Sequence, residues 1–91
     1  MKKHLIISGK VQGVGYRYWL QKYATQKGVF GWVRNLNTGQ VEVFLMGGER
    51  AISELIEECE LGPTNSLVEH IEISDSKDTC PTESFEILPT I

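Results

Sequence analysis

Long apolar runs are missing from this chain. A membrane-spanning helix needs about 20 consecutive apolar residues, and no run approaches that length. Met1 to His4 lead directly into a short strand-like run, without an extended apolar stretch and a small-residue cleavage site. We therefore expect a cytoplasmic protein with no signal peptide and no membrane partner.

An excess of basic residues is also missing. The formal net charge is −3, and the lysines and arginines are scattered along the chain. A sheet that binds RNA would carry a basic, aromatic stretch on a central strand, and Phe44-Leu45-Met46 does not supply one. The composition argues against nucleic acid as a partner, although one small anion needs only a local binding site.

Cysteine is scarce, and metal-binding patterns are missing. The chain has two cysteines, Cys59 and Cys80, neither in a CxxC pair, and it contains no HExxH or HxxxH pattern. We therefore expect no metal site and no cofactor. Cys59 falls on the apolar face of a predicted helix and Cys80 in a polar loop, so two free thiols and a disulfide both fit the sequence.

The remaining composition is typical of one small globular domain. The chain has 91 residues, of which 41% are hydrophobic and 23% charged. A chain of this length buries roughly 60% of its unfolded surface, which is enough for one core. We predict a single domain over residues 1–91. Nothing in the sequence indicates an oligomer, so we expect a monomer.

Hydrophobic periodicity predicts five strands and two helices. The strands are 4–11, 29–34, 40–46, 67–74 and 84–88, and the helices are 18–27 and 49–60. The helical stripes are Tyr16, Trp19, Leu20, Tyr23 and Ala24, then Ile52, Leu55, Ile56 and Cys59. Helices with one apolar stripe each must cover one face of a sheet, here a mostly antiparallel one. The predicted fold class is α+β, a ferredoxin-like βαββαβ sandwich.

The last two predicted strands are less regular. Leu67, Ile71 and Ile73 are in phase along strand 67–74, but Glu69 interrupts that phase. This strand is therefore expected to have one solvent-exposed end. In strand 84–88, Phe85 and Ile87 are expected to point inward.

A glycine-rich stretch, Gly9-Lys10-Val11-Gln12-Gly13-Val14-Gly15-Tyr16-Arg17, joins the first strand to the first helix. Glycine allows tight turns with positive φ, and the backbone N–H groups at a helix start can converge on an anion. Arg17 can bind two oxygens of the same anion through its planar guanidinium. We therefore predict a cradle for one phosphoryl group.

Other phosphate loops do not match this stretch. It lacks the Lys followed by Ser or Thr of a Walker A loop, and no third glycine follows Gly13-Val14-Gly15 to complete a dinucleotide fingerprint. The sequence also offers no Mg²⁺ cage and no Ser-His-acid set. These absences fit a phosphoanhydride with a carboxylate leaving group, which departs without a general acid because its conjugate acid has a pKa of about 4.

Two long motifs make the chain resemble the acylphosphatase family. The first is the stretch from Gly9 to Arg17, and the second runs from Gly31 through Trp32-Val33-Arg34-Asn35 to Gly47. The later Gly62-Pro63 and the final Phe85-Glu86-Ile87 are similar too. Tyr16 stands where many members have phenylalanine. The resemblance covers nearly the whole chain, and it implies the same βαββαβ fold.

The resemblance also implies an activity and a site. It implies a metal-free hydrolase of acyl phosphates that releases a carboxylate and inorganic phosphate, with phosphate as product and inhibitor. Arg17 is then expected to bind the phosphate, and Asn35 to orient the attacking water. The rest of the substrate-binding cradle is expected to be formed by the amides of Gln12, Gly13, Val14, Gly15 and Tyr16. As a neutral amide, Asn35 orients water without acting as a base.

One rival function survives from the residues alone. A small regulatory module that binds phosphate-bearing molecules without turnover would use the same cradle. Only an assay for hydrolysis distinguishes it from an enzyme.

Overall fold

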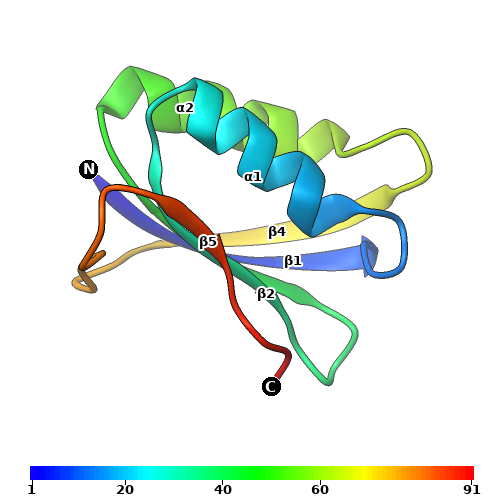
Figure 1. Cartoon of the computed structure of the whole chain (residues 1–91). Helices are drawn as coiled ribbons and strands as arrows, with labels where there is room; N and C mark the ends of the chain where they lie inside the picture. The colour runs from blue at the N-terminus through cyan, green and yellow to red at the C-terminus, as the bar shows by residue number, and fades with distance from the viewer.

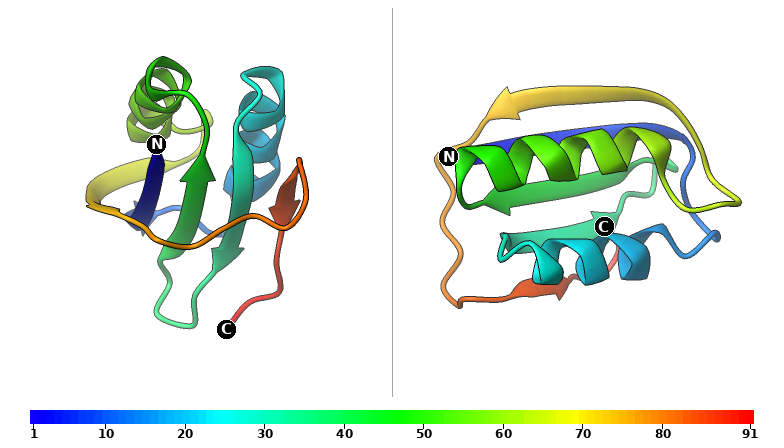
Figure 2. Two further views of the ribbon diagram at one scale, coloured as in Figure 1. Left: turned by 90° about the vertical axis from the view of Figure 1, so that its left-hand side faces the viewer. Right: turned by 90° about the horizontal axis from the view of Figure 1, so that it is seen from above.

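Two helices cover one face of a five-stranded sheet (Figures 1 and 2). The computed structural model describes residues 1–91. Its elements are β1 (Lys2–Lys10), α1 (Tyr16–Gln26), β2 (Phe30–Asn35), β3 (Val41–Met46), α2 (Glu49–Leu61), β4 (Leu67–Asp75) and β5 (Phe85–Ile87). The strand order across the sheet is β4-β1-β3-β2-β5.

The connections confirm the predicted ferredoxin-like sandwich. β3 pairs antiparallel with both β1 and β2, so β1 and β2 run parallel to each other and α1 connects them over one face. α2 likewise connects β3 to β4, which pairs antiparallel with β1. β5 adds a short edge strand parallel to β2. The sheet is therefore mostly antiparallel, with one parallel pair at its edge.

One buried cluster fills the space between the sheet and the helices. All residues predicted for the two helical stripes lie in this cluster or pack against it. The cluster consists of Leu5, Ile7, Val11, Tyr16, Leu20, Ala24, Val29, Val33, Val41, Val43, Leu45, Ile52, Leu55, Cys59 and Phe85. The 3.6-residue periodicity of the helices thus located the core correctly.

Several predicted boundaries are shifted by the local backbone. α1 begins at Tyr16 and not at residue 18, because Gly15 already adopts the left-handed conformation at the N-cap (φ 79°, ψ 18°). β1 begins at Lys2, because Lys2 and Lys3 pair with the end of β3. β5 spans only Phe85–Ile87, within the predicted 84–88.

The prediction that Leu67 is in phase with Ile71 is wrong, because β4 contains a bulge. Gly9 of β1 pairs with Val68 while its neighbour Ser8 pairs with His70, which leaves Glu69 without a partner. The extra residue shifts the alternation by one position. Val68 therefore packs on the core, whereas Leu67 is 61% exposed.

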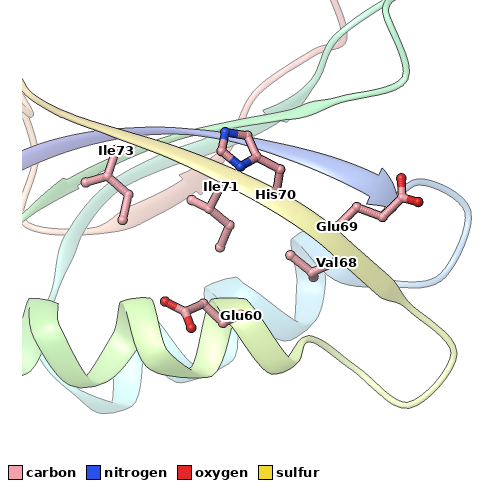
Figure 3. Close-up of a pocket in the computed structure, with 6 residues that line it drawn as sticks. All are labelled: Glu60, Val68, Glu69, His70, Ile71 and Ile73. Carbon is pink, nitrogen blue, oxygen red and sulfur yellow. The ribbon is translucent and has the colours of Figure 1, made fainter.

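An open groove runs between α2 and β4 (Figure 3). Its volume is about 340 Å³, and it is lined by Glu60, Val68, Glu69, His70, Ile71 and Ile73. Figure 3 shows Val68, Ile71 and Ile73 pointing from β4 toward α2. Ile73 has the predicted direction but remains 44% exposed, because β4 is an edge strand.

Both cysteines are free thiols, so the disulfide alternative is wrong for this structure. Cys59 is buried in α2, and this burial raises the pKa of its thiol to about 12. A thiol with such a pKa is inert at neutral pH. Neither α1 nor α2 has the length and apolar composition needed to cross a bilayer.

A charged network lies on the sheet face opposite the helices. Glu42 on β3 accepts hydrogen bonds from Arg34 Nε at 2.6 Å and pairs with His4 Nε2 at 2.7 Å. Burial alone would raise the pKa of Glu42, but the bonds from His4 and Arg34 outweigh it and hold this pKa below its ordinary value. The Arg34 guanidinium also stacks on Trp32, 4.7 Å from the ring centroid.

We expect the substitution Glu42→Gln to lower the free energy of unfolding by about 1–3 kcal/mol at pH 7, because two charge-assisted hydrogen bonds are lost. The pKa of Glu42 is lower in the folded state. Its contribution is therefore complete above its ordinary value of 4.5 and is lost as the pH falls through the folded value. Urea unfolding at pH 7 and at about pH 2.5 measures both effects. Glu57→Gln, at an exposed position of α2, is the control, and a difference that persists unchanged in acid would contradict this account.

Candidate active site

The glycine-rich loop and Asn35 lie at the same end of the sheet. β1 and β2 run parallel, so the loop that follows β1 and the last residue of β2 are at neighbouring strand ends. Asn35 pairs with Val41 on β3, which in turn pairs with Ile7 on β1. Asn35 is therefore about two strand spacings, roughly 10 Å, from the strand that leads into the loop.

The backbone of the loop offers a row of hydrogen-bond donors without acceptors. Gly13 and Gly15 have φ of 73° and 79°, a region that favours glycine. None of the hydrogen bonds outside helices and strands uses a backbone N–H of residues 12–18 as donor. α1 has no side-chain N-cap bond and no acidic residue in its first turn. The start of α1 is therefore open to an anion.

Arg17 is a free cation beside this row. Its guanidinium forms no ion pair with a carboxylate and lies 6.0 Å from the centroid of the Tyr18 ring. Gln21, one turn further along α1, donates to the carbonyl of Phe85 on β5 at 2.9 Å. Because residues i and i+4 share one helix face, Arg17 also lies on the flank of α1 that faces β2 and β5.

Asn35 presents a buried oxygen without a partner. Its neighbour across the strand pair, Val41, is buried in the core on the helix side, so the Asn35 side chain points to that same face. Asn35 Oδ1 is shielded from solvent and accepts no hydrogen bond, the only buried side-chain polar atom of which this is true. An unpaired buried acceptor costs about 1–3 kcal/mol. Such an atom is available to a water or a ligand.

The side chain of Gln12 holds the loop against the β2–β3 hairpin. Its Nε2 donates to the carbonyls of Leu36 and Gln40, both at 2.8 Å. Leu36 directly follows Asn35, so these bonds attach the loop next to the asparagine. From the sequence, only the backbone of Gln12 was expected to have a role. A glutamine in a glycine-rich stretch carries no signal that its side chain will contact a hairpin 24 residues away.

The predicted site residues come from three different parts of the fold. The loop from Gln12 to Tyr16 follows β1, Arg17 lies in the first turn of α1, and Asn35 ends β2. Val14 packs against the core, and Tyr16 is buried within it.

No group of three or more His, Cys, Asp or Glu side chains is arranged to hold a metal ion. The groove of Figure 3 lies on the β4 edge of the sheet, with β1 and β3 between it and Asn35, although its residue Val68 pairs with Gly9 where the glycine-rich stretch begins.

Comparisons with known proteins point to one family. The acylphosphatase family model matches residues 3–87. An acylphosphatase of Rhodopseudomonas palustris is 42% identical over 98% of this chain and 95% of its own length. One from Nitrobacter winogradskyi is 40% identical over the same shares. The crystal structure of acylphosphatase from Bacillus subtilis superposes with a TM-score of 0.90 at 33% identity, covering 96% of this chain and 97% of that one.

We expect the substitution Gln12→Met to lower the free energy of unfolding by about 1–3 kcal/mol. Methionine keeps the length of the side chain but cannot form the two hydrogen bonds to the hairpin. Amide hydrogen exchange should speed up most at Leu36 and Gly39, in the turn that Gln12 contacts. Gln26→Met, at an exposed position at the end of α1, is the matched control. Equal stability and equal exchange in the two variants would show that these bonds hold nothing in place.

Proposed function

The chain belongs to the acylphosphatase family and is a hydrolase, and we propose that it cleaves the carboxyl–phosphate bond of acyl phosphates without a metal ion. The products are a carboxylate and inorganic phosphate. One observation carries the proposal: free loop amides and an unpaired Arg17 lie at the end of the sheet where Asn35 Oδ1 is buried without a partner.

Phosphoryl binding falls to the loop and Arg17. The amides of residues 12–17 have no acceptor in the protein, so an anion gains their hydrogen bonds without breaking others. The Arg17 guanidinium binds two phosphoryl oxygens at once. Together they balance the charge that spreads over the three equatorial oxygens in the transition state.

Asn35 orients the attacking water in this proposal. Its buried Oδ1 accepts a hydrogen of the water and holds the water oxygen in line with the bond that breaks. The water oxygen forms the new bond to phosphorus, and the electron pair of the old P–O bond leaves with the carboxylate. The proton of the water passes to a phosphate oxygen or to bulk water, since Asn35 cannot accept it.

The setting that we propose is a cytoplasmic monomer with a small-molecule substrate. Both cysteines are free, which is the usual state in a reducing compartment. The net charge of −3 gives no support to nucleic acid or to an anionic membrane surface as partner.

Hydrolysis of benzoyl phosphate in the presence of EDTA tests the proposal. Saturable release of benzoate, inhibited competitively by inorganic phosphate, is the expected result. Binding of phosphate without release of benzoate would identify a ligand-binding module in place of the enzyme. Activity that appears only when a divalent cation is added back would overturn the metal-free mechanism.

We expect Arg17→Lys to raise the dissociation constant of phosphate by about 10- to 100-fold and to lower kcat as well, because lysine replaces a two-point contact by a single charge. Phosphate titration calorimetry and steady-state kinetics measure the two effects. Arg50→Lys, on an arginine that is 94% exposed on α2, is the control. Unaltered kinetics in Arg17→Lys would remove Arg17 from the site.

We expect Asn35→Ala to lower kcat by at least about 100-fold with phosphate affinity retained, because only the water loses its partner. The variant should be at least as stable as the wild type, since it removes a buried oxygen that has no hydrogen-bond partner. Asn65→Ala, in an exposed loop, is the control. Loss of phosphate binding in Asn35→Ala would make Asn35 a ligand of the phosphate.

A further inference from the structure

At the C-terminal end of α2, the carbonyl of Cys59 lacks a backbone donor. In an α-helix each carbonyl accepts from the N–H four residues further on. The carbonyl of Glu58 follows this rule and accepts from Gly62 at 2.9 Å. For Cys59 the fourth residue on is Pro63, which has no N–H. The Cys59 carbonyl therefore needs a donor from elsewhere, or it remains unpaired beside a buried side chain.

Tyr16 supplies that donor. Its hydroxyl donates to the carbonyl of Cys59 at 2.7 Å, in a buried hydrogen bond between residues 43 positions apart. Tyr16 is only 2% exposed. Burial raises the pKa of this phenol well above its ordinary value, so the hydroxyl keeps its proton and remains a donor throughout the neutral range.

The turn after α2 is shaped around the Tyr16 ring. Gly62 has φ 68°, and a Cβ atom at this position would lie 3.2 Å from Cε2 of Tyr16. Ser66 fixes the same turn by donating from both its backbone N–H and its hydroxyl to the carbonyl of Pro63, at 2.9 and 2.7 Å. The Tyr16 ring is also 5.3 Å from that of Trp19. Ring and hydroxyl together therefore attach the first residue of α1 to the end of α2.

Tyr16 lies between Gly15 and Arg17, so whatever fixes Tyr16 also fixes the start of α1. We propose that Tyr16 is a positioning residue: its hydrogen bond to α2 holds the loop amides and Arg17 in the arrangement that binds phosphate. The inference rests on the proposed function for the identity of the ligand. Gln12 holds the loop against the hairpin from one side, and Tyr16 holds it against the helix layer from the other.

The test compares Tyr16→Phe with Tyr23→Phe. Both variants lose one phenol oxygen on α1, but only the Tyr16 hydroxyl bonds to α2, whereas the Tyr23 ring packs edge-on against Trp19. Far-UV circular dichroism establishes that each variant is folded, and thermal unfolding gives its stability. Calorimetry with inorganic phosphate, well below the unfolding temperature, gives the dissociation constant. Kinetics with benzoyl phosphate gives KM and kcat.

For Tyr16→Phe we expect the phosphate dissociation constant and KM to rise together by about three- to tenfold, the factor that one lost hydrogen bond corresponds to. The value of kcat should change little, because the lost contribution is to binding. Phosphate titration followed by amide chemical shifts should show altered responses at residues 12–17. Tyr23→Phe should match the wild type in all three measurements.

Two results would overturn the inference. One is a lower unfolding temperature for Tyr16→Phe with wild-type phosphate affinity, which makes the bond structural only. The other is an equal loss of affinity in Tyr23→Phe. If the wild type binds phosphate but releases no benzoate, the proposed function fails while the phosphate comparison still decides the role of Tyr16. If the wild type binds no phosphate at all, both fail.

Discussion

The parallel alignment of β1 and β2, with β3 between them, is the constraint on which the site depends. It places the carboxyl ends of two strands at one end of the sheet. A loop that follows the first strand and a side chain that ends the second are then neighbours, although residues 12 and 35 are far apart in the sequence. α1, which connects the two strands, directs its N-terminus to the same place.

Open backbone donors and an unpaired buried acceptor lie together at this end. The loop amides of residues 12–18 have no acceptor, and the only buried side-chain oxygen without a partner is Asn35 Oδ1. On the opposite face of the sheet, by contrast, Glu42 is bonded to both His4 and Arg34. A buried oxygen without a partner beside open backbone donors favours a ligand at that place.

Periodicity predicted the parts of the fold that depend on burial alone. The helical stripes are consequences of one core, and the structure confirms them. The predicted phase of Leu67 with Ile71 was wrong because a bulge depends on how two strands pair, and the paired residues Ser8 of β1 and His70 of β4 are far apart in the sequence. No local pattern in the sequence indicates which residues of two distant strands will pair.

The site divides in the same way. The positive φ of Gly13 and Gly15 was predictable, because it is a property of glycine itself, and the prediction for Arg17 rests likewise on its own guanidinium. The contacts of Gln12 and Tyr16 were not, because each bond ends on a carbonyl that any residue could provide. Residue types alone do not identify such acceptors.

Small size makes these long-range contacts important. A chain of 91 residues has one core and little excess stability, while a backbone that keeps its donors free for a ligand gives up hydrogen bonds of its own. The loop is therefore attached to its surroundings by two of its own side chains: Gln12 bonds to the hairpin and Tyr16 bonds to α2. Because side chains make these bonds, the loop amides remain free. A site made of backbone amides can stay open only if side chains take over the task of holding that backbone in place.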